Sequence, residues 1–183
     1  MTSIVSSVRP AIVMLLLCSV LFGLVYPFVS TITLQLLFFD KAEGSLIKNS
    51  DGGILGSTLI GQEFISDKYF WSRLSASSYK PLGSGGSNLS IDNPALINLI
   101  KQRKAHEKPI PIDLVTASAS GLDPHISIAS AWYQLNRVAQ ARNMSKEELR
   151  NIIQKFIEPR QFGILGEPIV NVLKLNLALD KKI

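Results

Sequence analysis

Cysteine and histidine are scarce in this 183-residue sequence, which contains one Cys and two His. A structural zinc site usually takes four Cys or His ligands, and the only three candidates are Cys18, His106 and His125. A zinc finger is therefore excluded, and a single cysteine rules out a disulfide within one chain. Catalytic metal sites also use carboxylates, so the count does not exclude that class. Since the sequence has no acidic metal cluster, we predict no metal site.

Charge is absent from the long stretch between Pro10 and Phe39. Its first part, AIVMLLLCSVLFGLVYPFV, has about the 20 residues that a helix needs to cross the apolar core of a bilayer. We therefore predict a transmembrane helix over residues 10–30, with Pro10 in its first turn and Pro27 as a kink near its far end. A cleaved signal peptide is the alternative. Its apolar region would be only about 7–15 residues long, and the residues around Pro27 make a poor cleavage site.

The charges that flank this run predict its orientation. Arg9 and the amino terminus precede it without an acidic residue. The residues just after it are of mixed charge: Asp40, Lys41 and Glu43. Because the more positive flank tends to stay in the cytoplasm, we predict a single-pass protein with a short cytoplasmic N-terminus at residues 1–9. The extracytoplasmic domain then covers residues 31–183, with a membrane-proximal linker to about residue 45.

Concentrated positive charge is also missing, although the net charge is +5 and the sequence pI is near 9.4. The densest basic group, KQRKAHEK at residues 101–108, contains a Glu and no interleaved aromatic residues. This pattern is typical of a solvated helix face rather than of a nucleic-acid site. We predict no nucleic-acid partner.

The outer domain mixes strand and helix signals, which predicts an α+β fold made of one compact unit. A turn at residues 51–53 precedes the first of three predicted strands, over residues 54–60, 69–73 and 113–116. Helices are predicted from Pro94, from Ile128 and after Ser145, with Asn93, Ser127 and Ser145 as N-caps and Asn143 as the end of the second. Residues 166–180 are ambiguous. Pro168 favours a helix, alternating leucines favour a strand, and we favour the helix.

The stretch SASGLDPHIS, residues 118–127, brings a serine, an aspartate and a histidine close together. One hypothesis is a hydrolase site with Ser120 as nucleophile and His125 as base. It needs a Ser–His hydrogen bond, and the residues around Ser120 do not form a Gly-x-Ser-x-Gly nucleophile elbow. The other hypothesis is a structured loop, since Gly121 permits positive φ, Pro124 keeps Asp123 out of the helical region, and Asp123 can accept backbone N–H groups.

We favour the loop, and we place His125 at the start of the following helix. We predict no catalytic residue in this chain. The candidate set for a structural or partner-contacting role is Ser120, Gly121, Asp123, Pro124 and His125.

Several segments in this order resemble one family, the C subunit of the Kdp-type potassium-transporting P-type ATPase (KdpC). They are GSTLIGQEF (56–64), YFWSR (69–73), GSNL (86–89), NPAL (93–96), DLVTASASGLDPHIS (113–127) and GEPIVNVLKLNLALD (166–180). Three positions differ from the pattern expected of the family: Leu74, Ser90-Ile91 and Ile128. The N-terminal anchor also fits the family, so the resemblance covers nearly the whole chain.

The resemblance implies a non-catalytic accessory subunit of a potassium pump in the cell inner membrane. Its partners would be a channel-like potassium-binding subunit, an ATP-hydrolysing P-type subunit and membrane lipid. The family is described as a catalytic chaperone that raises the ATP affinity of the hydrolysing subunit. ATP, magnesium and potassium would be handled by the complex, and no cofactor by this chain. The alternatives are a membrane-anchored hydrolase using Ser120 and His125, and a free-standing extracytoplasmic binding module.

Overall fold

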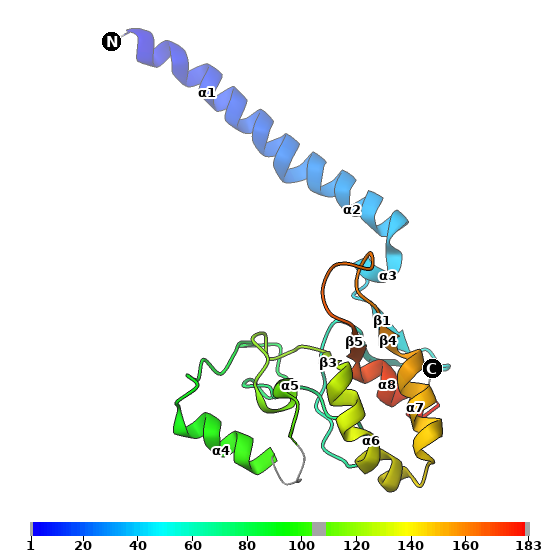
Figure 1. Cartoon of the computed structure of the whole chain (residues 1–183). Helices are drawn as coiled ribbons and strands as arrows, with labels where there is room; N and C mark the ends of the chain where they lie inside the picture. The colour runs from blue at the N-terminus through cyan, green and yellow to red at the C-terminus, as the bar shows by residue number, and fades with distance from the viewer. Residues whose placement is uncertain (1, 104–108, 182–183) are drawn as a thin grey trace. The chain divides into compact units, whose positions relative to one another are not determined.

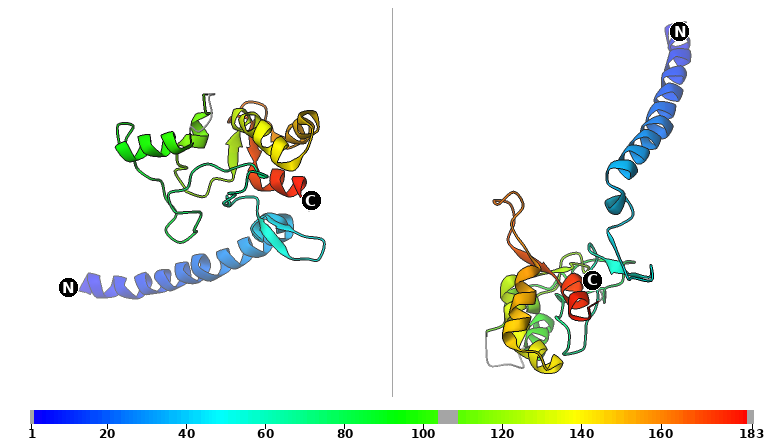
Figure 2. Two further views of the ribbon diagram at one scale, coloured as in Figure 1. Left: turned by 90° about the horizontal axis from the view of Figure 1, so that it is seen from below. Right: turned by 90° about the vertical axis from the view of Figure 1, so that its right-hand side faces the viewer.

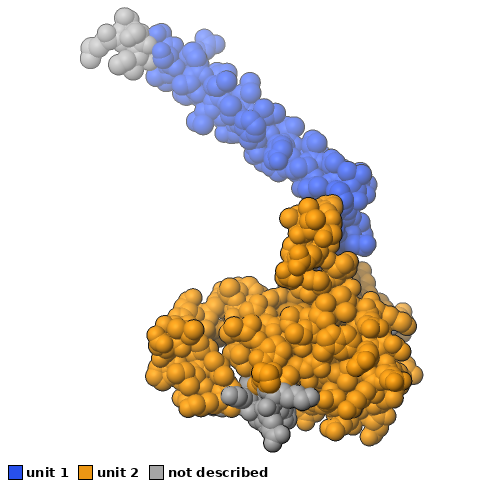
Figure 3. Space-filling model, in the orientation of Figure 1, with its two compact units in different colours: residues 1–45 blue, residues 46–183 orange. Residues whose placement is uncertain are grey.

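The computed structural model of the chain describes residues 2–103 and 109–181. The chain divides into two compact units, residues 1–45 and residues 46–183 (Figure 3). His106 and much of the basic group at residues 101–108 lie outside the described residues.

Most of the described part of unit 1 is helical. Its elements are α1 (Thr2–Val20), a π-helical turn η1 (Leu21–Val25), α2 (Tyr26–Leu37) and the short α3 (Phe39–Ala42). By length and composition, the 32 residues Ser6–Leu37 form a helix able to cross a membrane. At 1.5 Å per residue this helix is about 48 Å long, against an apolar bilayer core of about 30 Å. The apolar helix therefore extends past residues 10–30 at both ends.

Pro10, one of the two prolines of unit 1, lies elsewhere in its helix than predicted. Pro10 lies inside α1 because that helix begins at Thr2, so the expectation that Pro10 marks the first turn was wrong. Pro27 lies in the first turn of α2, directly after the π-helical turn. Because proline lacks an N–H and its ring clashes with the carbonyl one turn back, an irregular turn at this point accommodates it while the helix continues.

Unit 2 begins with a two-stranded antiparallel hairpin, β1 (Leu46–Lys48) and β2 (Ile54–Ser57). The predicted turn at residues 51–53 is present, with Gly52 at φ +80° and the N–H of Asn49 bonded to the carbonyl of Gly53 at 2.8 Å. The predicted strand is confirmed in position, but it ends at Ser57 rather than at residue 60.

The rest of unit 2 packs helices against a three-stranded antiparallel sheet of order β3-β5-β4 (Figures 1 and 2). The strands are β3 (His125–Ser127), β4 (Ile157–Glu158) and β5 (Ile169–Asn171). The helices are α4 (Pro94–Arg103), α5 (Ile112–Val115), α6 (Ile128–Arg142), α7 (Lys146–Lys155) and α8 (Val172–Leu179). This mixture of helices with antiparallel sheet is consistent with the predicted α+β class.

Local sequence signals placed the ends of three helices correctly. The side chain of Asn93 accepts the N–H of Ala95 at 2.9 Å at the start of α4. The side chains of Ser127 and Ser145 each accept the N–H three residues on, at 3.1 Å, and so cap α6 and α7. Asn143 ends α6 in the left-handed conformation, with φ +53°.

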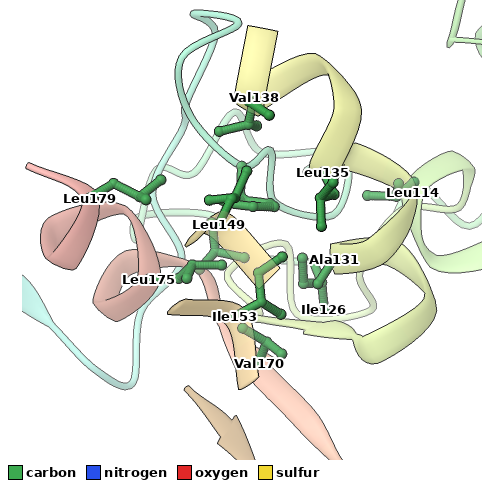
Figure 4. Close-up of a cluster of buried hydrophobic side chains, with 13 residues drawn as sticks. Leu114, Ile126, Ala131, Leu135, Val138, Leu149, Ile153, Val170, Leu175 and Leu179 are labelled. Atoms are coloured by element: carbon green, nitrogen blue, oxygen red, sulfur yellow. The ribbon is translucent and has the colours of Figure 1, made fainter. Parts of the chain in front are cut away.

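The hydrophobic core lies between α6, α7, α8 and the three-stranded sheet (Figure 4). Apolar residues at helical spacing supply it from α6 and α7, while Ile126 and Val170 supply it from the sheet. Its members from the helices include Ala131, Leu135, Val138, Leu149, Ile153 and Leu175. Phe70 is also fully buried here.

Two segments of unit 2 differ from the predicted elements. Residues 113–116 were expected to be a strand, but residues 113–115 form most of the short helix α5 and Thr116 caps its end. The carboxylate of Asp113 accepts the N–H of Ser127 at 2.8 Å and the hydroxyl of Ser130, so α5 is fixed by the start of α6. Residues 166–180 contain the favoured helix, α8, which includes the alternating leucines, but the short strand β5 precedes it and Asn171, not Pro168, caps its start.

Candidate functional site

The segment of residues 118–127, hereafter the 118–127 segment, follows α5, includes strand β3 and ends where α6 begins. It lies against loops that are distant in the sequence. The N–H of Ser118 donates to the carbonyl of Leu74 at 2.8 Å. The N–H of Gly61 donates to the carbonyl of Leu122 at 2.8 Å. His125 lies in strand β3, opposite Asn171, so its expected place at the start of a helix was wrong. The segment is therefore held along most of its length by backbone bonds.

Close backbone approach explains the glycines at this place. A Cβ atom on Gly121, which has φ +70°, would lie 2.7 Å from the hydroxyl of Ser77 and 2.9 Å from the carbonyl oxygen of Gly85. A Cβ on Gly61 would lie 2.6 Å from the carbonyl oxygen of Asp123. Neither position has room for a side chain, and Gly121 also needs the left-handed conformation, as its sequence context predicted.

Asp123 is the charged centre of the segment. Its Oδ1 accepts the backbone N–H of His125 at 3.0 Å, which confirms the predicted local bond. Its Oδ2 accepts a hydrogen bond from the Arg73 guanidinium at 3.0 Å, and the His125 Nδ1 lies 3.6 Å from Oδ1. Partial burial raises the pKa of Asp123, but the hydrogen bonds to His125 and the Arg73 charge outweigh it, so that pKa lies below 3.8.

Asn171 connects the 118–127 segment to the C-terminal helix. Its Nδ2 donates to the carbonyl of Thr58 at 2.8 Å and lies 3.4 Å from the His125 Nε2. Its Oδ1 accepts the N–H of Lys174 at 3.1 Å and so caps α8. Val172 follows Asn171 in the chain, and its N–H donates to the carbonyl of the buried Pro124 at 2.9 Å. These hydrogen bonds thus hold the backbone at Thr58, at Pro124 and at the start of α8 in place.

The contacts of Ser120 test the hydrolase hypothesis directly. The Ser120 hydroxyl lies 3.1 Å from the Ser118 hydroxyl and accepts the N–H of Leu122 at 3.1 Å. Within the described residues, the side chain of His125 faces Asp123 and Asn171 and makes no hydrogen bond to Ser120. Since nucleophilic catalysis requires that Ser–His contact, the arrangement does not support a hydrolase. Within residues 2–103 and 109–181 no three His, Cys, Asp or Glu side chains gather as a metal site would need.

Two buried amides, which sequence reasoning missed, hold the aromatic segment at residues 69–73. Asn176 accepts the N–H of Phe70 at 2.8 Å and donates to its carbonyl at 3.0 Å. Gln134 does the same for Trp71, at 2.7 Å and 3.2 Å. The predicted strand here was therefore wrong, because side-chain amides replace a partner strand. Gln134 and Asn176 interrupt otherwise apolar helix faces, and that signal was available in the sequence.

Arg73 and Asn171 are the other residues missed at the site. Arg73 lies 50 residues from Asp123 in the sequence, and Asn171 lies 46 residues from His125. Neither has a local motif that would pair it with its partner.

Sequence comparisons agree with the resemblance noted above. The family model described as "K+-transporting ATPase, c chain" matches residues 8–181. A potassium-transporting ATPase KdpC subunit of Paraburkholderia phytofirmans is 50% identical over 184 residues, covering 94% of this chain and 95% of its own. The subunit of the same name in Burkholderia cenocepacia is 50% identical over 186 residues, 96% of each chain. That of Burkholderia mallei is 52% identical over 183 residues, 94% of each chain. The chain therefore belongs to the KdpC family.

Proposed function

We propose that this chain is a non-catalytic accessory subunit of an ATP-driven potassium uptake complex, needed for assembly of the complex and for potassium-coupled ATP hydrolysis. The observation that carries the proposal is the family match over residues 8–181, together with relatives named as potassium-transporting ATPase subunits. The geometry of the 118–127 segment supports it, since the polar side chains there serve the fold and not a reaction.

The proposed topology has the N-terminus in the cytoplasm and unit 2 outside. It is supported by Arg9 before the apolar helix and by Asp40 and Glu43 after it. Protease added to intact spheroplasts digests unit 2 in this topology, and digestion only after lysis would reverse it.

The proposed partners are a channel-like potassium-binding subunit, an ATP-hydrolysing P-type subunit and the lipid around the single helix. ATP is cytoplasmic, so in this topology unit 2 has no direct contact with it. Any effect of this chain on ATP affinity then passes through the membrane helices as a coupling free energy between two sites. ATP, magnesium and potassium are handled by the other subunits.

Reconstitution tests the proposal. The pump subunits are assembled in proteoliposomes with and without the full chain, and potassium-stimulated ATP hydrolysis is measured in each. We expect hydrolysis to depend on the chain, and the isolated chain to show no saturable ATP binding. A chain whose apolar helix is replaced by an unrelated transmembrane helix is the matched control for the contribution of unit 1. Full activity without any form of the chain would refute the accessory role.

A further inference from the structure

The connection between β4 and β5 is an apolar hairpin, residues 159–168, which projects from the body of unit 2 (Figures 1 and 2). Gln161 and Leu165 pair across it, with both N–H···O distances 2.9 Å. Its tip carries Phe162, Ile164 and Leu165, whose exposed fractions are 92%, 75% and 55%. Large apolar side chains thus protrude into solvent from a loop that has no charged residue between Arg160 and Glu167.

The hairpin is fixed in shape although its side chains are exposed. At its neck, the Arg160 Nη2 lies 2.7 Å from both carboxylate oxygens of Glu167. At its tip, Phe162 has φ +54° and Gly163 has φ +78°, and the N–H of Gly163 bonds to the carbonyl of Arg160 at 3.1 Å. A phenylalanine in the left-handed region is strained, so the backbone bonds across the hairpin hold this conformation against a cost.

We infer that the apolar hairpin inserts Phe162 into an apolar pocket on the extracytoplasmic face of a membrane subunit of the same pump. The inference rests on the proposed function, because that function supplies the partner. Exposed aromatic side chains at the tip of a rigid protrusion are typical anchors of protein interfaces. A loop that is already ordered loses little conformational entropy on binding, which favours a shaped protein pocket.

Charge argues against lipid as the occupant. Loops that bind a bilayer surface combine apolar side chains with an excess of Lys and Arg, which are attracted to anionic headgroups. In the hairpin, the only basic residue is Arg160, and Glu167 neutralises it at 2.7 Å. The two charges at the neck therefore sum to zero, so the hairpin lacks the excess of basic residues that strengthens the binding of such loops to anionic headgroups.

Photo-crosslinking identifies the occupant. Phe162 is replaced by p-benzoylphenylalanine in the full chain, the pump is assembled in its native membrane, and crosslinked products are identified after irradiation. The matched control carries the same amino acid at Glu147, an exposed residue in the first turn of α7, at the opposite end of that helix from β4 and the hairpin. We expect a crosslink from position 162 to a membrane subunit of the pump and none from position 147. Crosslinks from position 162 to lipid alone would refute the inference.

Binding measurements supply the second test. The double variant Phe162→Ser with Ile164→Ser is titrated against the other pump subunits, purified in detergent without this chain. We expect its Kd to rise by about tenfold or more, as for loss of an interface anchor. Leu82→Ser is the matched control, because Leu82 is 94% exposed in a different loop, and its Kd should equal that of the wild type. An unchanged Kd for the double variant, or an equal rise for Leu82→Ser, would refute the hairpin as the anchor while leaving the accessory role intact.

Discussion

The 118–127 segment and the apolar hairpin differ in where their side chains make contacts. In the 118–127 segment, polar groups bond inward to Arg73, Asn171 and nearby backbone, and Gly121 is packed too closely for a side chain. In the apolar hairpin, the hydrogen bonds are those of the backbone and of the Arg160–Glu167 ion pair at the neck. The side chains at its tip are exposed to solvent. A conspicuous group of polar residues here serves stability, whereas an inconspicuous apolar loop has the features of a contact surface.

Glycine substitution should show the largest difference between the two regions. Gly121→Ala and Gly163→Ala both put a Cβ on a residue of positive φ, which costs about 1 kcal/mol or more. Only Gly121 also has atoms within 3 Å of the new Cβ, and forcing such a group into a packed site adds about 1–3 kcal/mol. We therefore expect the free energy of unfolding to fall by about 3 kcal/mol for Gly121→Ala and about 1 kcal/mol for Gly163→Ala.

Urea unfolding of the full chain in mild detergent, followed by tryptophan fluorescence, measures this difference. Both tryptophans of the sequence, Trp71 and Trp132, lie in unit 2, so the signal reports that unit alone. Equal losses for the two glycine variants would mean that Gly121 is not closely packed in solution.

Removal of the Asp123 charge should have the next largest effect. Asp123→Asn weakens the bonds to His125 and Arg73, and we expect the free energy of unfolding to fall by about 1–2 kcal/mol. Asp67→Asn is the matched control, because Asp67 is 68% exposed and 3.5 Å from Arg137, a geometry that contributes little to stability. Thermal and urea unfolding of both variants give the comparison. A loss as small as that of Asp67→Asn would show that the centre of the 118–127 segment is not stabilising.

The pH dependence of the Asp123 effect sharpens this test. Because the folded-state pKa of Asp123 is lowered, its charged form stabilises the fold. That stabilisation is complete above the unfolded-state pKa, near 3.8, and is lost as the pH falls through the lower folded-state pKa. The difference in unfolding free energy between wild type and Asp123→Asn should therefore shrink as the pH falls below about 4. A difference that grew as the pH fell below 4 would reverse the assigned sign.

Local structure could be predicted from the sequence where the interacting residues are close together in the chain, and could not where they are far apart. The caps at Asn93, Ser127 and Ser145 were predictable because each bonds to an N–H two or three residues on. The aromatic segment was mispredicted because Phe70 bonds to Asn176, 106 residues away. No local pattern specifies such a pairing, and β-rich composition alone then favours a strand.

The candidate site divides in the same way. The turn at Gly121 and the bond from Asp123 to His125 were predictable from neighbouring residues, whereas the Arg73 ion pair was not. The hairpin escaped notice for another reason. Large apolar residues such as Phe162, Ile164 and Leu165 are usually buried, and only the three-dimensional structure shows that these three are exposed.

The smallest expected effect on stability is that of Phe162→Ser. Phe162 is 92% exposed, so its ring loses almost no contact with unit 2 on replacement, and the free energy of unfolding should change by less than about 0.5 kcal/mol. This outcome separates the two regions most clearly, because the same substitution, combined with Ile164→Ser, should weaken binding to the pump. A loss above about 1 kcal/mol would show that the ring packs against unit 2 in solution. The hairpin would then be a structural element like the 118–127 segment, and any weaker assembly of the variant would follow from instability rather than from a lost contact.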